Sequence, residues 1–309
     1  MKVNNLTDKQ PYNSWTSGQL NPDYYQDYAT YFVKWVEAFK KEGINIYAIT
    51  PQNEPLNRGN SASLYMGWEE QRNFVKTALG PQFAQAGLST KIYAYDHNYD
   101  YDNIDSQKNY PVKIYEDEVA ASYLAGAAYH NYGGDRSELL EVHNSRPDKE
   151  LIFTETSIGE WNSGRNLEER LLEDMASIAL GTVNNWCKAV MVWNLMLDND
   201  LGPNRPGGCT TCYGAVDIGY DYKTIRRNSH YYIIGHLASV VKPGAVRIGA
   251  KGYNGEGITY TAFENTDGTY ALVLLNNSDV KTKITISDEN NHFAYDVPAN
   301  AVVSYRWKK

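Results

Sequence analysis

The feature that most constrains this chain is a repeated alternation between segments of helical spacing and short apolar segments, running from Asn21 to about Ser239. Apolar residues spaced roughly every three to four positions are typical of a helix, whereas a short continuous apolar segment is typical of a buried strand. The apolar segments cover residues 44–50, 91–98, 125–132, 150–156 and 188–197. Five strands separated by helices predict a parallel sheet with right-handed crossings, and a closed barrel is the common form of such a sheet.

Local start and stop signals support the helices between these strands. The first predicted helix, residues 21–43, opens with Asn21-Pro22-Asp23 and stops at Gly43, which are residue types favoured at those positions. The other predicted helices cover residues 67–87, 110–123, 135–146 and 166–185.

The pattern changes after Pro243, where short alternating segments are separated by turns. These segments cover residues 245–251, 257–265, 269–277, 282–288, 292–298 and 302–309. Alternation of this kind is typical of antiparallel strands with one buried face. We therefore expect a barrel domain over residues 1–242, followed by an antiparallel β-sandwich domain over residues 243–309 with a packing role.

Charge and hydropathy argue against two classes of partner. The net charge is -8 and the isoelectric point is about 5.3, whereas nucleic acids and anionic membranes attract basic surfaces. No apolar run approaches the ~20 residues that cross a bilayer, and the first ten residues, MKVNNLTDKQ, lack the apolar core of a signal peptide. We expect neither a nucleic-acid partner nor a membrane span.

Aromatic residues and cysteines give weaker indications. The chain has 26 Tyr and 7 Trp against 7 Phe, a bias that suits interfaces and polyhydroxylated ligands. Cys209 and Cys212 form the motif CTTC, but no second pair completes a zinc site, so we predict neither metal nor cofactor. A local disulfide between these two cysteines is our interpretation, and a reduced buried pair is the alternative.

Polar or amphipathic side chains follow every predicted strand of the barrel at the same end. They are Asn53 and Glu54, then Asp96, His97 and Asn98, then His130 and Tyr132, then Glu155, and finally Trp193 and Asn194. Catalytic residues of parallel barrels come from the carboxyl ends of the strands, so the joint placement indicates an active site.

Each of these residues also has an ordinary structural explanation. Glu54 could be a solvated loop carboxylate, and residues 96–98 could form a turn with local hydrogen bonds. His130 and Tyr132 could be a satisfied core pair, and Trp193 could be a core residue. Two carboxylates at one barrel mouth nevertheless suit glycoside hydrolysis, in which a separation of about 5–5.5 Å predicts retention and a wider gap predicts inversion.

The chain contains, in this order, the motifs ITPQNEP, YDHN, YHNYGG, FTETSIGEW, VWNLMLDNDLGPN and HLASVVKPGAVRI. Together these six motifs resemble glycoside hydrolase family 30, which contains glucosylceramidases and endo-β-1,6-glucanases. The resemblance implies a (β/α)8 barrel of the TIM type with an appended β domain, and double displacement with retained configuration. It matches Glu54 to the acid/base at the end of the fourth strand and Glu155 to the nucleophile at the end of the seventh.

The resemblance also implies roles in substrate binding. Asn53 matches the residue that hydrogen-bonds the sugar 2-hydroxyl, Tyr132 the residue that orients the nucleophile, and Trp193 a wall of the sugar pocket. The other residues that we expect to bind substrate are Asp96, His130, Trp161 and Asn194.

Against the family pattern, the opening of this chain resembles the loop after the third strand. We therefore expect strands four to eight only, with two open sheet edges that self-association could cover. The expected substrates are β-1,6-glucan or glucosylceramide-like β-glucosides. The alternatives are a non-catalytic carbohydrate-binding remnant, or the same chemistry on xylan or another β-glycan. A secreted or periplasmic location is expected from the resemblance alone.

Overall fold

This computed structural model describes residues 1–3, 15–99, 104–253 and 255–309. The chain divides into two compact units. Unit 1 contains Met1–Thr156, Trp186–Ala189 and Pro206–Gly208, and unit 2 contains Ser157–Asn185, Val190–Arg205 and Cys209–Lys309. Throughout the described ranges, no helix has both the length and the apolar composition that crossing a membrane requires.

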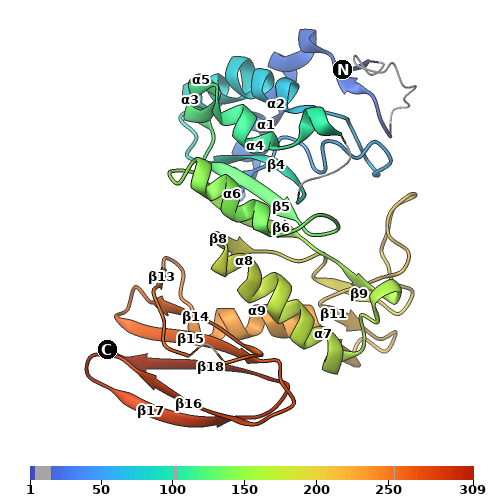
Figure 1. Cartoon of the computed structure of the whole chain (residues 1–309). Coiled ribbons are helices and arrows are strands. Elements are labelled where there is room, and N and C mark those ends of the chain that lie inside the picture. The colour runs from blue at the N-terminus through green and yellow to red at the C-terminus, as the bar shows by residue number, and fades with distance from the viewer. Residues whose placement is uncertain (4–14, 100–103, 254) are drawn as a thin grey trace. The chain divides into compact units, whose positions relative to one another are not determined.

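A parallel sheet organises unit 1, and its five strands pair in chain order. Strands β4, β5, β6 and β8 of this sheet are labelled in Figure 1. They are β3 (Ala48–Ile49), β4 (Lys91–Asn98), β5 (Gly126–His130), β6 (Glu150–Glu155) and β8 (Cys187–Val190). Helix α1 (Tyr25–Lys41) precedes β3 in the chain. Between β3 and β6 the chain forms α2 (Trp68–Phe74), α3 (Gly80–Gln85), α4 (Tyr110–Tyr115), α5 (Glu118–Tyr123) and α6 (Ser137–Ser145). This order confirms the predicted barrel-type α/β fold.

Local sequence accounts for the bounds of α1. A short 3-10 turn, Pro22–Tyr24, leads into α1; the Asn21 side chain caps this turn by accepting a hydrogen bond from the Asp23 N–H at 3.1 Å, and Pro22 is its first residue. At the other end Gly43 has a φ of +80° and donates to the carbonyl of Lys40 at 3.0 Å. Glycine tolerates this left-handed conformation, which ends the helix where the sequence predicts.

The predicted helix over residues 110–123 is instead two helices. Asp117 has extended backbone, and its carboxylate accepts hydrogen bonds from the N–H groups of Val119 and Ala120. An N-cap in mid-segment starts a new helix, so α4 ends before it and α5 begins after it. A wider helical turn, Val75–Leu79, joins α2 to α3. Together they form the single helical segment that the sequence predicts over residues 67–87.

The interior of the sheet is built from small and aromatic side chains. Tyr93, Ala128 and Ile152, on three adjacent strands, form one buried cluster. Gly126 lies where β5 and β6 approach closely, because a Cβ there would stand 1.8 Å from the carbonyl oxygen of Glu150. Close strand packing therefore requires glycine at this position.

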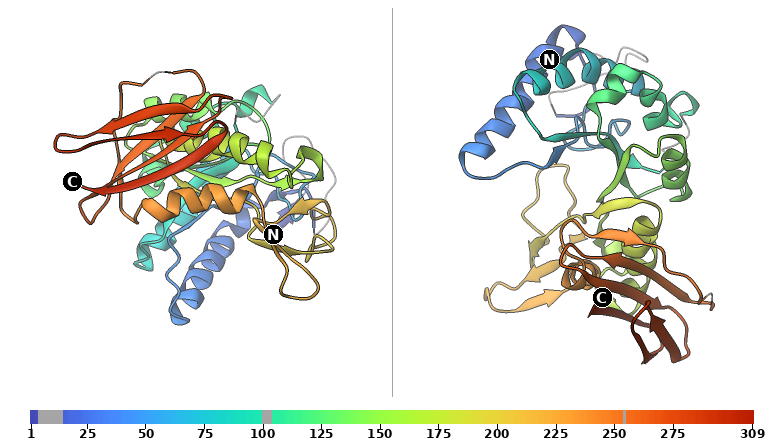
Figure 2. Two further views of the ribbon diagram at one scale, coloured as in Figure 1. Left: turned by 90° about the horizontal axis from the view of Figure 1, so that it is seen from below. Right: turned by 90° about the vertical axis from the view of Figure 1, so that its left-hand side faces the viewer.

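Unit 2 contains helices, two small sheets and a β-sandwich (Figures 1 and 2). The helices are α7 (Leu167–Asp174), α8 (Leu180–Asn184) and α9 (Ser229–Val240). The small sheets pair β7 (Ile158–Gly159) with β10 (Cys212–Tyr213), and β9 (Met196–Asp198) with β11 (Val216–Ile218) and β12 (Ile225–Arg227). The α9 helix contacts the sandwich, where Nδ1 of His236 lies 2.8 Å from Oγ of Ser304.

The sandwich follows the predicted alternation. One sheet has the order β13-β14-β15-β18, and the other pairs β16 with β17. Their bounds are Val246–Ile248, Ile258–Glu264, Thr269–Asn276 and Ala301–Lys308 for the first sheet, and Thr282–Ser287 and His292–Val297 for the second. Leu272, Leu274, Ile284, Ile286 and Val297 share the core between the sheets. The antiparallel sandwich prediction is confirmed, while the domain boundary after residue 242 stays a prediction.

One predicted strand, residues 188–197, is wrong as a single element. The β8 strand ends at Val190, and Met196–Asp198 pairs in parallel with β11 in a different sheet. Between them Leu195 is 77% exposed. An apolar run does not by itself specify one strand, because the same pattern suits two short strands in different sheets.

Candidate active site

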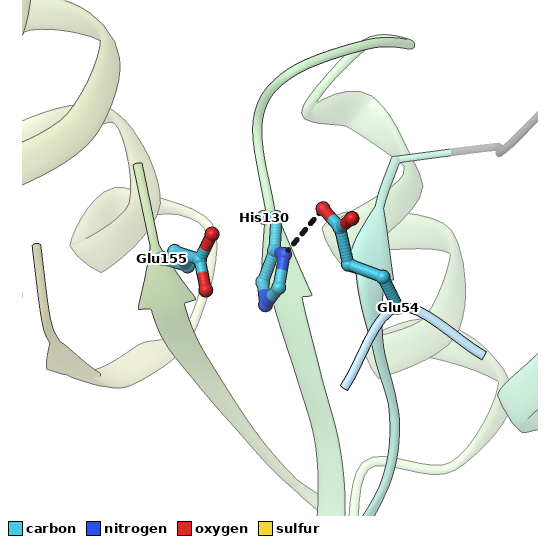
Figure 3. A group of neighbouring side chains, drawn as sticks. All are labelled: Glu54, His130 and Glu155. Carbon is cyan, nitrogen blue, oxygen red and sulfur yellow. Dashed lines mark hydrogen bonds and ion pairs between the residues drawn. The ribbon is translucent and has the colours of Figure 1, made fainter. Parts of the chain in front are cut away.

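Side chains from neighbouring strand ends of unit 1 converge on one place. The loop after β3 supplies Glu54, β5 supplies His130 and β6 supplies Glu155 (Figure 3). One ligand-type atom from each of the three lies within 4.8 Å of the others. His130 stands between the two carboxylates (Figure 3). The backbone helps to position Glu54, whose N–H donates to the carbonyl of Asp96 at 2.9 Å.

A bulge in β4 brings Asp96 to this place. Tyr93 belongs to the interior cluster, so strict alternation would put Asp96 on the opposite face. The pairing of β4 with β5 shifts between Tyr95 and His97, and both Tyr95 and Asp96 have positive φ. Bulges re-aim side chains in this way, and they are frequent beside active sites.

Asp96 and His130 form a buried hydrogen-bonded pair. His130 is 1% exposed, and its Nε2 lies 3.1 Å from Oδ1 of Asp96. Asp96 also accepts hydrogen bonds from the hydroxyls of Thr50 at 2.6 Å and Thr154 at 2.7 Å. These contacts join four successive strands or strand ends, so residues 96–98 are more than a turn with local hydrogen bonds.

Glu54 is 6% exposed and hydrogen-bonded at both carboxylate oxygens. Its Oε1 lies 3.2 Å from Nδ1 of His130 (Figure 3). Its Oε2 accepts from the side-chain amides of Asn57 at 2.8 Å and Asn60 at 2.9 Å. A loop carboxylate in solvent does not have these partners, so the solvated-loop alternative is inconsistent with the structure.

Glu155 is half-buried and bonded on one side. The hydroxyl of Tyr132 donates to Oε1 of Glu155 at 3.0 Å, and the N–H of Tyr132 donates to Oδ1 of Asn98 at 2.9 Å. Asn98 therefore helps to place the tyrosine that contacts Glu155.

Burial and neighbouring charges shift the pKa values of this cluster. Burial raises the pKa of Glu54, but the hydrogen bond from His130, together with the interactions of His97 and Asn57, outweighs it and brings that pKa below its usual value. Burial raises the pKa of Glu155, and the charge of Glu54 adds to the increase. For His130, burial lowers the pKa, but the hydrogen bonds to Asp96 and Glu54 raise it to about 10. The imidazole is therefore the strongest base of the group.

Glu54, His130 and Glu155 are close enough together to be considered as metal ligands. Both ring nitrogens of His130 already face carboxylate oxygens, at 3.2 Å and 3.1 Å. A metal at Nδ1 would have to replace the hydrogen bond to Glu54. The expectation of no metal stays a prediction.

The remaining predicted site residues are placed as follows. Asn53 is exposed next to Glu54 in unit 1. Trp161, Trp193 and Asn194 belong to unit 2, where the two tryptophan side chains are 55% and 45% exposed. Exposure argues against Trp193 as a core residue, and the positions of all three relative to the carboxylates stay predictions.

Sequence reasoning missed four residues that hydrogen-bond to the site carboxylates: Thr50, Asn57, Asn60 and Thr154. A signal existed for Thr154, which lies two positions after Ile152 and therefore shares its face of β6. Asn57 and Asn60 follow Glu54 by three and six positions in an irregular loop, where no periodicity indicates direction.

A disulfide joins Cys209 and Cys212, whose Cα atoms are 5.7 Å apart. Cys212 pairs with Gly159 between β10 and β7, and the N–H of Glu160 donates to the carbonyl of Thr211 at 3.0 Å. The disulfide loop thus braces the segment that carries Trp161.

Comparisons with known proteins agree with this architecture. Residues 5–241 match the description Glycosyl hydrolase family 30 TIM-barrel domain, and residues 244–305 match Glycosyl hydrolase family 30 beta sandwich domain. A solved structure entitled "The endo-beta1,6-glucanase BT3312" has 75% identity and a TM-score of 0.98, over 100% of this chain and 68% of that chain.

Two curated relatives are more distant. Endo-1,6-beta-D-glucanase BGN16.3 of Trichoderma harzianum is 32% identical over 99% of this chain and 61% of that protein. Lysosomal acid glucosylceramidase of Mus musculus is 26% identical over 94% of this chain and 58% of that protein. The chain thus spans about three fifths of the length of these relatives. By its sequence and its fold, this chain belongs to glycosyl hydrolase family 30.

Proposed function

We propose that this protein is a retaining glycoside hydrolase that cleaves β-1,6-linked glucan by double displacement. In this reaction Glu155 attacks the anomeric carbon, and Glu54 protonates the leaving oxygen and later activates water. The observation that carries the proposal is the approach of Glu54 and Glu155 to within 4.8 Å at one end of a parallel sheet. Carboxyl groups of inverting enzymes stand about 6.5–9.5 Å apart, whereas those of retaining enzymes are about 5–5.5 Å apart.

The choice of β-1,6-glucan rests on the relatives. The solved structure with 75% identity is entitled an endo-β1,6-glucanase, and so is the curated protein of Trichoderma harzianum. Within this proposal Asn53 binds the sugar 2-hydroxyl, and Asp96, His130, Trp161, Trp193 and Asn194 contribute to the substrate site.

The pKa values of Glu54 and Glu155 are shifted in directions opposite to those that their proposed roles suggest. A general acid holds a proton and a nucleophile does not, yet the pKa of Glu54 is lowered and that of Glu155 is raised. Burial is the largest influence on both groups, and the hydrogen bond with His130 is what turns the balance for Glu54. The protonation of Glu54 therefore has to be considered together with that of His130.

The test is a product profile on pustulan, a β-1,6-glucan, with laminarin, xylan and an aryl β-glucoside as comparisons. Proton NMR of the first product gives its anomeric configuration. The expected result is cleavage of pustulan with a β product. An α first product would contradict retention, and cleavage of xylan alone would contradict the substrate. Glycan binding without any cleavage would favour the non-catalytic binding alternative.

Two further expectations belong to this proposal. Export from the cytoplasm is consistent with the Cys209–Cys212 disulfide, since disulfides persist in oxidising compartments. Mass spectrometry with and without reductant tests it, and two freely alkylated thiols in the native protein would contradict it. Self-association at an edge strand of the sheet, β3 or β8, would appear as a concentration-dependent mass in ultracentrifugation.

A further inference from the structure

The two carboxylate oxygens of Glu54 have different kinds of partner. Oε2 accepts from the amide nitrogens of Asn57 and Asn60, at 2.8 Å and 2.9 Å. Because an amide nitrogen only donates, a proton on Oε2 would face two donors. A proton carried by Glu54 therefore belongs on Oε1, which faces Nδ1 of His130 at 3.2 Å.

The partner of the second ring nitrogen of His130 indicates whether that nitrogen carries a hydrogen. Nε2 lies 3.1 Å from Oδ1 of Asp96, which also accepts from the hydroxyl of Thr154 at 2.7 Å. Oδ2 of Asp96 accepts from the hydroxyl of Thr50 at 2.6 Å. An aspartate held by two hydroxyl donors acts as an acceptor, so Nε2 carries a hydrogen and Nδ1 is the position whose protonation changes.

We infer that His130 holds the proton that Glu54 delivers to the leaving oxygen, and that Asp96 is the positioning residue for the imidazole. This inference rests on the proposed glycosidase function and deepens it. In the resting state Nδ1–H donates to ionised Glu54. The proton moves to Oε1 and then to the glycosidic oxygen, as the bond from that oxygen to the anomeric carbon breaks and the bond to Glu155 forms.

The second half of the reaction restores the resting state. A water molecule attacks the anomeric carbon, and the bond to Glu155 breaks with its electron pair returning to the carboxylate. The proton released by the water passes to Oε1 of Glu54 and back to Nδ1 of His130. The net reaction is hydrolysis, with no proton gained or lost by the protein.

The surroundings of His130 support this assignment. The titratable groups that face its ring from the packed elements are Glu54, Asp96, His97, Tyr132 and Glu155. Burial lowers the pKa of His97 to about 4, so that ring is neutral near pH 7. The neighbouring carboxylates then favour the charged form of the His130 ring, so this ring carries the positive charge of the cluster. A low pKa for Glu54 is what this arrangement requires, because the proton waits on the imidazole.

The central test is His130→Asn, which retains a hydrogen-bond donor but has no titrating nitrogen. On pustulan the leaving alcohol needs protonation, so kcat/KM should fall about 10²- to 10⁴-fold, the usual size of general acid catalysis. On 2,4-dinitrophenyl β-glucoside the leaving group needs no proton, so formation of the glycosyl-enzyme should continue at close to the wild-type rate. The basic limb of the pH profile on pustulan should move to lower pH, because a carboxylic acid alone must then hold the proton.

His230→Asn is the matched control, since His230 is a buried histidine of α9 in unit 2. It should affect both substrates to the same extent and leave the basic limb in place. Thermal unfolding of both variants separates a folding defect from a chemical one. Equal losses on the two substrates for His130→Asn, or an unmoved basic limb, would overturn the inference.

A second measurement does not need turnover. Imidazole ¹⁵N NMR of the full chain should show both ring nitrogens of His130 protonated well above the ordinary histidine pKa of about 6.5. In Glu54→Gln the pKa of His130 should fall, because one of its carboxylate partners is gone. If the His130 ring of the wild-type protein is already neutral at a pH well above about 6.5, the inference is overturned, even if the protein cleaves no substrate. If wild type cleaves no β-glycoside, the proposed function is wrong, and the role of His130 in delivering a proton is wrong with it.

Discussion

The hydroxyl of Tyr132 donates a hydrogen bond to Oε1 of Glu155 at 3.0 Å, across two adjacent strand ends. This contact holds the orientation of the carboxylate, and in the proposed reaction the other oxygen, Oε2, is the one that attacks. It also gives the ionised form of Glu155 a donor, which opposes the effect of burial on the pKa.

Removal of that hydroxyl should therefore slow catalysis. For Tyr132→Phe we expect kcat/KM on pustulan to fall about 10- to 100-fold, because a hydrogen bond to a charged group contributes about 1.5–3 kcal/mol. Tyr222→Phe is the control, since Tyr222 is 87% exposed. Unchanged kinetics for Tyr132→Phe would show that the contact does not orient the nucleophile.

The two glutamates should respond differently to mutation. Glu155→Gln should abolish turnover on every substrate, because an amide does not form the glycosyl-enzyme bond. Glu54→Ala should still form that bond with an activated aryl glucoside and should recover turnover when azide replaces the activated water. Intact mass spectrometry of the trapped protein detects the adduct by its added mass. Wild-type rates for Glu54→Ala on pustulan would rule out Glu54 as the acid/base.

Gly159 should be necessary for the position of Trp161. A Cβ at Gly159 would stand 1.9 Å from the Trp161 ring and 2.5 Å from the carbonyl oxygen of Thr211. If Trp161 binds sugar, Gly159→Ala should raise KM on pustulan about 2- to 10-fold, the range of one aromatic contact. Gly249→Ala, where no atom of the described residues lies within 4 Å of the added carbon, should leave KM unchanged. A Trp161→Ala variant with wild-type KM would contradict the sugar-binding role.

A buried ion pair should dominate the stability of the helical part of unit 2. Asp174 is fully buried and bonds both Arg170 and the hydroxyl of Ser229. Asp174→Ala should lower the free energy of unfolding by about 3–5 kcal/mol, because it leaves a buried guanidinium without this partner. Glu173→Ala removes an exposed partner of the same arginine and should cost about 0–1 kcal/mol. Urea denaturation measures both, and equal losses would contradict the prediction.

The acid sensitivity of unit 1 should depend on Glu150. Burial raises the pKa of Glu150, but hydrogen bonds from Lys188, Lys91 and Tyr93 lower it from 4.5 to about 2. A folded-state pKa below the ordinary value stabilises the protein above pH 4.5, and that contribution is lost as the pH falls through about 2. Wild type should therefore lose its stability advantage over Glu150→Gln across this window, as followed by thermal unfolding. A constant difference between the two proteins would contradict it, and the exposed Glu289→Gln is the control.

Much of the fold and part of the site follow from local sequence. Helical and strand periodicities are properties of neighbouring residues, so the five strands, the helices between them and the sandwich could be predicted. Chain order in a parallel sheet then places the residues that follow each strand at one end. This reasoning indicated Glu54, Asp96, His130, Tyr132 and Glu155 together, and the structure brings them to one place.

Other features depended on contacts between distant residues. The break after Val190 required the pairing of Met196–Asp198 with a strand 20 positions later. The direction of Asp96 required a bulge with positive φ at Tyr95 and Asp96, where no glycine signals it. One carboxylate oxygen of Glu54 accepts from two side-chain amides, and the other faces an imidazole. This arrangement required the loop that carries Glu54 to fold back toward the end of the preceding strand. The sequence by itself determined which residues reach the carboxyl end of the sheet. Only the tertiary structure decided which proton donor faces which oxygen, because hydrogen-bond direction depends on strand register and backbone dihedrals that local periodicity does not encode.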